Sequence, residues 1–221
     1  MLGFKLYVDA LQEAAEYQLV YEGTNNQHTV LSTDTTPNLV TGTTYRYVLV
    51  AYNSYGDSPI SEEIRIALGC LPLTPSKPTK IEELSSLTSI AVQWERVEFL
   101  DDVPVDGYHL WMDDGLHGDF KQVYNGSGLP FNTTFTAERL VTGLPYRFKL
   151  QSENRNGFSD FSEVLTVYAC LKPSNMPAAF KTATTKTSIT IQWQEPEENG
   201  CPIQGFDILH DYGVNGAFQL M

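Results

Sequence analysis

The stretch Val141-Thr-Gly-Leu-Pro-Tyr-Arg-Phe148 has an earlier copy, Val40-Thr-Gly-Thr-Thr-Tyr-Arg-Tyr47, that begins 101 residues before it. Two further segments repeat with nearly the same spacing: Cys70 returns as Cys170, and Ser89–Trp94 returns as Ser188–Trp193. A period of about one hundred residues is the length of a whole small domain rather than of one turn of a solenoid. The chain therefore contains copies of one domain.

Residues 75–170 alternate between apolar and polar side chains, and turn residues interrupt the alternation roughly every 8–12 residues, which is typical of an all-β sandwich. Asp113-Asp114-Gly115 predicts a hairpin turn, because Asp-Gly tolerates the positive φ that such turns need. Ala10–Glu16 carries a weak helical pattern. We expect six side chains in or beside the core: Trp94, Tyr108, Leu110, Tyr146, Phe148 and Leu150.

The phase of the repeat predicts three parts. Gly3 matches Gly107 and Phe218 matches Phe120, so the first and third copies are incomplete. We expect late strands only in residues 1–70, a complete copy in 75–170 and early strands only in 171–221. Half a sandwich leaves strand edges and an apolar face uncovered. We therefore expect this chain to be a segment of a longer array or filament.

These motifs resemble the fibronectin type III domain. Its pattern recurs in order as Trp94, Leu140, Tyr146, Asn154, Gly157, Ser159 and Ser162, and in the first copy as Leu39, Tyr45, Asn53, Gly56, Ser58 and Ser61. The third copy supplies Pro177 and Trp193. The resemblance implies tandem seven-stranded immunoglobulin-like β-sandwiches, with Leu140 and Tyr146 in the tyrosine corner. It also implies core positions for Tyr45, Trp94, Tyr146 and Trp193.

The composition argues against two classes of partner. With 14 basic and 27 acidic residues the net charge is −13, which repels phosphate backbones and anionic lipid surfaces. No apolar run approaches the ~20 residues that span a bilayer. We expect neither nucleic-acid binding nor membrane insertion.

The sequence predicts no enzyme, cofactor or metal site. The histidines at 28, 109, 117 and 210 lack metal-ligand spacing, and no phosphate-binding glycine loop or acid–base pair is evident. Two acidic clusters invite a calcium hypothesis, but they lack alternating Asp-x-Asp spacing and favour solvated charge: Glu95, Glu98, Asp101 and Asp102, and Glu195, Glu197 and Glu198. The loops 53–57 and 154–157 carry no Arg-Gly-Asp motif, so integrin binding through that motif is not expected.

Two kinds of covalent modification are expected if the protein is secreted. Asn125-Gly126-Ser127 and Asn132-Thr133-Thr134 are N-glycosylation sequons. The family's sandwich places a domain's first residues beside its second-to-third strand loop, so the resemblance implies a Cys170–Cys201 disulfide. Cys70 should keep a thiol or pair outside this segment. The opposing hypothesis is three reduced cysteines in an intracellular protein.

The leading functional hypothesis is a structural or adhesive spacer of a long extracellular array, whose partners are proteins or further copies of itself. The alternative is an intracellular cytoskeletal or axonemal scaffold built of the same repeats. An enzyme remains only if a neighbouring domain carries the chemistry.

Overall fold

The computed structural model describes residues 3–9, 17–98, 103–211, 213 and 216–221, and their regular secondary structure is all β. The expected helix at 10–16 lies outside these residues. No helix in the described ranges has the length and apolarity to cross a membrane. The backbone divides into two compact units, residues 1–79, 92–135 and 147–165, and residues 80–91, 136–146 and 166–221.

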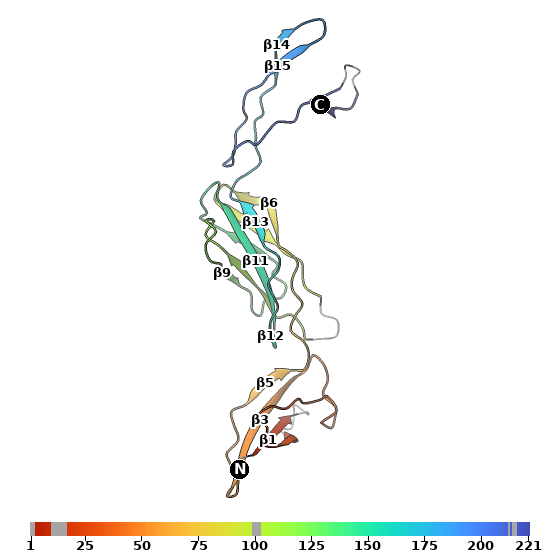
Figure 1. The fold of residues 1–221 in the computed structure, drawn as a ribbon, viewed down its shortest axis with the longest axis vertical. Helices are drawn as coiled ribbons and strands as arrows, with labels where there is room; N and C mark the ends of the chain where they lie inside the picture. The colour runs from red at the N-terminus through yellow and green to blue at the C-terminus, as the bar shows by residue number, and fades with distance from the viewer. Residues whose placement is uncertain (1–2, 10–16, 99–102, 212, 214–215) are drawn as a thin grey trace. The chain divides into compact units, whose positions relative to one another are not determined.

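The first unit begins with a five-stranded antiparallel sheet (red to orange in Figure 1). Its order is β2-β1-β3-β4, and β5 also pairs with β3. Aromatic and β-branched residues fill its longest strand, β3, and such side chains pack well on a pleated surface. The strands are β1 (Gly3–Asp9), β2 (Tyr17–Gly23), β3 (Thr44–Asn53), β4 (Gly56–Asp57) and β5 (Ile64–Ala67).

A second five-stranded sheet has the order β12-β11-β8-β9, with β13 also on β11 (Figure 1). Its strands are β8 (Gly107–Met112), β9 (Lys121–Asn125), β11 (Pro145–Asn154), β12 (Gly157–Phe158) and β13 (Leu165–Tyr168).

The hairpin predicted at Asp113–Gly115 is confirmed: β8 pairs with β9 in antiparallel register, and Gly115 has a positive φ of 76°. The connecting loop is longer than the predicted turn and covers residues 113–120. The buried Asp113 carboxylate also accepts hydrogen bonds from the Arg147 backbone N–H at 2.8 Å and from its guanidinium at 2.6 Å. This long-range pair holds the start of the loop against β11.

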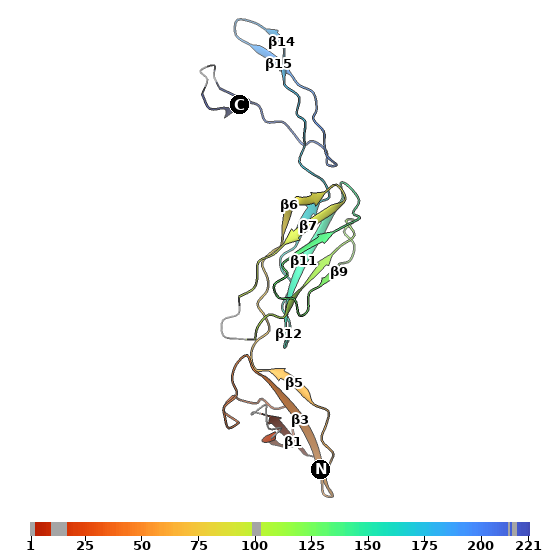
Figure 2. The ribbon, with the colours of Figure 1, turned by 180° about the vertical axis from the view of Figure 1, so that it is seen from behind.

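The second unit centres on the three-stranded sheet β10-β7-β6, whose strands β6 and β7 are adjacent in Figure 2. Two further hairpins, β14–β15 and β16–β17, follow later in the chain. The bounds are β6 (Thr79–Ser86), β7 (Ser89–Gln93), β10 (Thr134–Ala137), β14 (Phe180–Thr184), β15 (Ile189–Gln192), β16 (Leu209–His210) and β17 (Gln219–Leu220).

The six side chains expected in the core of residues 75–170 are all buried. The Trp94 ring lies 6.0 Å from that of Tyr108 and 5.9 Å from that of Tyr124, between ring centroids. Tyr45 is buried in the first sheet. Trp193 differs from its expected core position: it packs on Phe206 at 5.5 Å but is only partly buried. The strands before it, β14 and β15, are exposed along their length, so little covers the ring.

Both faces of β8 are covered, although its alternating sequence suggests one solvated face. His109 is buried, with Phe158 edge-on to its ring at 5.0 Å. The Gln122 side-chain amide donates to His109 Nδ1 at 2.7 Å. The ring proton of His109 is then on Nε2, which donates to the Glu153 carboxylate at 2.7 Å. Burial raises the pKa of Glu153, but hydrogen bonds from Ser127 and His109 outweigh it, and the pKa lies below its ordinary value.

Replacing Trp94 with alanine should lower the free energy of unfolding by ~3–5 kcal/mol, because the change empties a large buried site. Urea denaturation followed by circular dichroism measures this loss. Tyr55→Ala is the matched control: Tyr55 is 99% exposed, and its removal should change stability by less than about 0.5 kcal/mol. Equal losses in the two variants would contradict the core position of Trp94.

The lowered pKa of Glu153 predicts a pH dependence of stability. A carboxyl whose pKa is lower in the folded state stabilises the fold above its unfolded pKa of about 4.3, and this contribution disappears as the pH falls through the folded value. Glu153→Gln should therefore lose less stability than the parent between about pH 5 and pH 3. Glu83→Gln, on the exposed side of β6, is the control. An unchanged acid profile in Glu153→Gln would refute this role.

Candidate functional site

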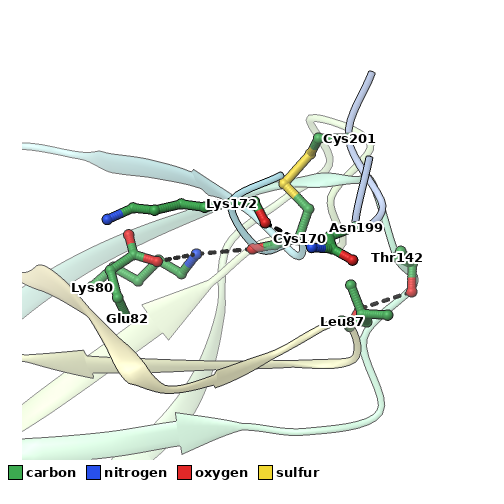
Figure 3. The surroundings of a disulfide bond; sticks show 8 residues. All are labelled: Lys80, Glu82, Leu87, Thr142, Cys170, Lys172, Asn199 and Cys201. Carbon is green, nitrogen blue, oxygen red and sulfur yellow. Dashed lines mark hydrogen bonds and ion pairs between the residues drawn. A yellow bond between two sulfur atoms is a disulfide. The ribbon is translucent and has the colours of Figure 1, made fainter. Parts of the chain in front are cut away.

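A disulfide joins Cys170, two residues after β13, to Cys201, in the loop that follows β15 (Figure 3). The sulfur atoms lie 2.06 Å apart and the Cα atoms 5.7 Å apart, across a sequence separation of 31 residues. The Cα separation falls in the range that a disulfide spans without backbone movement. These are the two cysteines for which the family resemblance implies a disulfide.

Backbone pairing extends the junction beyond the sulfur atoms. The Leu171 N–H donates to the Asn199 carbonyl at 3.0 Å, and Ser174 and Glu197 exchange hydrogen bonds at 3.1 and 3.0 Å. The Asn199 amide nitrogen donates to the Lys172 carbonyl at 2.7 Å and to the Ser174 hydroxyl oxygen at 2.9 Å. Residues 171–174 and 197–199 therefore form a short ladder, with the disulfide at one end.

Gly200 allows the two segments to approach closely. Asn199 and Gly200 have φ values of 49° and 93°, a left-handed region that favours these residue types. A Cβ on Gly200 would lie 2.5 Å from the Thr142 methyl carbon and 3.4 Å from the Cys170 Cβ. The Asn-Gly pair before Cys201 is thus a requirement of the junction.

Lys80 of β6 supports the cysteine from another strand. Its ammonium donates to the Cys170 carbonyl at 3.1 Å and pairs with Glu82 at 3.1 Å (Figure 3). Thr142 similarly donates to the Leu87 carbonyl at 2.8 Å. Sequence reasoning missed both supports, because Lys80 and Cys170 lie 90 residues apart and no local pattern links them.

A groove of about 780 Å³ runs beside the disulfide. Much of its lining is apolar: Tyr168, Leu171, Pro173, Met176, Pro196, Pro202, Ile203 and Phe206. The site therefore joins a covalent bond, a backbone ladder and an apolar groove. This arrangement restrains a joint in the chain and carries no evident chemistry of its own.

The remaining predicted residues are dispersed. Asn125 and Asn132 are both exposed. Asn125 Oδ1 accepts from the Ser127 backbone N–H at 3.1 Å, and the Asn132 side-chain amide donates to the Tyr124 hydroxyl at 2.8 Å. Cys70 is exposed and outside the disulfide. The described residues hold no group of three or more histidine, cysteine or acidic side chains placed for a metal ion, and Asp101 and Asp102 lie outside them.

Ser127, His109 and Glu153 resemble a catalytic triad in residue type only. The Ser127 hydroxyl lies 3.4 Å from His109 Nε2, but Glu153 occupies that same nitrogen, and Nδ1 faces Gln122. A triad needs the carboxylate on the opposite ring nitrogen from the serine. The cluster therefore supplies hydrogen-bond partners to the buried His109 ring and does not activate the serine.

Known proteins that match the chain are several times its length. Fibronectin type-III domain-containing protein 3A of Mus musculus is 28% identical over 176 residues, covering 77% of this chain and 14% of that protein. Myomesin-2 of Homo sapiens is 30% identical over 176 residues, covering 76% and 12%. Receptor-type tyrosine-protein phosphatase S of Gallus gallus is 28% identical over 172 residues, covering 76% and 10%. The chain thus spans 10–14% of these relatives.

A solved structure, the crystal structure of chicken CNTN1 FN1-FN3 domains, matches with a TM-score of 0.47 and 20% identity, over 76% of this chain and 56% of that one. The family model for the Fibronectin type III domain matches residues 75–168, the region that holds strands β6 to β13. This chain is a fibronectin type III domain protein, with that all-β sandwich at residues 75–168.

Proposed function

We propose that this chain is a non-catalytic spacer or adhesive segment of a long extracellular array of fibronectin type III sandwiches. The observation that carries the proposal is the Cys170–Cys201 pair, in which both cysteines lie within disulfide reach on either side of a chain junction. Structural disulfides persist in oxidising compartments and are rare in the cytosol. The exposed sequon residues Asn125 and Asn132 fit the same location.

The disulfide has a mechanical role in this proposal. Closing a loop of about 30 residues stabilises the folded chain by ~3–4 kcal/mol in the chain-entropy model. Because the bond closes the ladder between 171–174 and 197–199, opening the joint requires breaking backbone pairing as well as covalent linkage. A spacer that bears tension benefits from a joint restrained in both ways.

Other sandwiches of the same type are the proposed partners. Several large apolar side chains in the last two hairpins are exposed: Phe180, Ile189, Ile191, Leu209 and Leu220. Apolar side chains gathered on strands favour protein contacts over contact with water. Further protein of this fold, either from the same chain or from another copy, supplies the kind of surface that would cover them.

The location is tested on protein purified from its native source. Intact mass before and after enzymatic removal of N-glycans detects sugar, and thiol labelling without reductant counts reduced cysteines. We expect a loss of mass on deglycosylation and a Cys170–Cys201 linked peptide. Three labelled cysteines and no change of mass would reject the extracellular location and favour the intracellular scaffold.

Replacing both Cys170 and Cys201 with serine should reduce the free energy of unfolding by ~3–4 kcal/mol, since the unfolded chain regains the entropy of the open loop. Urea denaturation without reductant measures the difference. Hydrogen exchange at the Leu171 amide should also become faster, because its bond to Asn199 loses the covalent closure. Cys70→Ser is the control, with an expected change below about 0.5 kcal/mol. Unchanged stability and exchange in the double variant would rule out a restraining role.

A further inference from the structure

The first sheet has the same strand register as the sheet of β8, β9 and β11 in the complete copy at 75–168. Leu6 of β1 lies opposite Tyr21 of β2 and Leu49 of β3. The residues at the same positions of the repeat pair in the same way: Leu110 with Tyr124 and Leu150. The two sheets therefore present equivalent faces.

This face is buried in the complete copy and accessible in the first sheet. Leu150 is fully buried, whereas its counterpart Leu49 is 47% exposed. A groove of about 270 Å³ is open beside Leu49, and Phe4, Leu6 and Tyr21 also line it. Phe4 and Tyr21 are the counterparts of Tyr108 and Tyr124, the two tyrosines on which Trp94 packs. The groove therefore lies where the complete copy places a tryptophan. We call the face formed by Phe4, Leu6, Tyr21 and Leu49 the accepting face.

The hairpin β14–β15 (blue in Figure 1) carries the side chains that match this face. Ile189 and Ile191 alternate along β15, and Trp193 continues the alternation one residue after the strand ends. Their counterparts in the complete copy are Ile90, Val92 and Trp94. The first two counterparts are fully buried, whereas Ile189 is 74% and Ile191 40% exposed. We call the face formed by Ile189, Ile191 and Trp193 the donated face.

We propose that the donated face of one copy of this chain packs on the accepting face of a second copy, with Trp193 in the groove beside Phe4 and Tyr21. The inference rests on the proposed function and names the partner of the spacer. Burial of apolar side chains on both faces drives the contact, and the aromatic rings fix its register.

A second copy fits the order of the repeats. Residues 180–193 follow the complete copy and residues 3–67 precede it, so a contact between two copies places early strands before late ones, as in 75–168. The two faces belong to different parts of the chain, and the contact is therefore head-to-tail. Contacts of this kind repeat from copy to copy and build an open filament when they do not close into a ring.

Sedimentation equilibrium of the 221-residue chain over a range of concentrations tests the contact. We expect oligomers whose size grows with concentration. Leu49→Asp blocks the accepting face and Ile191→Asp blocks the donated face. Each variant alone should associate at least about a hundredfold more weakly than the parent, because the contact would bury an unpaired charge. Leu84→Asp is the matched control, since Leu84 is an exposed leucine on β6 of the complete copy, and this variant should associate as the parent does.

A mixture of the two blocked variants gives the sharpest outcome. One variant keeps the donated face and the other keeps the accepting face, so an equimolar mixture should form dimers and no larger species. Circular dichroism verifies that each variant is folded. A parent chain that stays monomeric at all concentrations, a mixture that forms no dimer, or an equal loss in Leu84→Asp would overturn the contact.

Photo-cross-linking identifies the occupant of the groove without the charged variants. Benzoylphenylalanine in place of Tyr21 should link to the peptide that carries Trp193. A mixture of isotope-labelled and unlabelled chains should give links between the two isotopic forms. Links within one copy only, or links to a segment other than 177–193, would overturn the second copy as the occupant. Neither experiment bears on the glycan and thiol measurements, which test the proposed location separately.

Discussion

In both copies of the repeated motif, a tyrosine hydroxyl fixes the corner before the longest strand. The hydroxyl oxygen accepts a hydrogen bond from the backbone N–H of the residue five positions earlier in the chain. Tyr146 accepts from Val141 at 2.9 Å, and Tyr45 accepts from Val40 at 2.7 Å. Each corner requires a glycine with positive φ, Gly143 at 83° and Gly42 at 80°. The N–H of each glycine then bonds to a late residue of its copy, Ala169 or Leu68.

The disulfide junction and a charged groove are built on these two corners. In the second copy, Gly143 positions Ala169, and the next residue is the bonded Cys170; a Cβ on Gly143 would lie 2.9 Å from the Gly200 carbonyl oxygen. In the first copy, Gly42, Thr43, Thr44 and Arg46 line a groove together with Asp9, Arg65 and Arg155. One local motif thus positions a covalent joint in one place and a charged groove in the other. The difference lies in the residues that each corner meets.

The parts that sequence predicts are those set by local pattern. Strand alternation locates Trp94 and Leu150 in the core. The Cys170–Cys201 disulfide follows instead from the resemblance to the fibronectin type III sandwich, which implies that both cysteines lie at one junction. Contacts between residues that are far apart in the sequence cannot be predicted from local pattern. The Asp113 carboxylate pairs with Arg147 across 34 residues, and Arg155 donates to the Thr44 hydroxyl across 111 residues. Trp193, which is only partly buried, shows a related limit. The sequence pattern identifies an apolar face of a strand, but it does not identify the residues that cover that face.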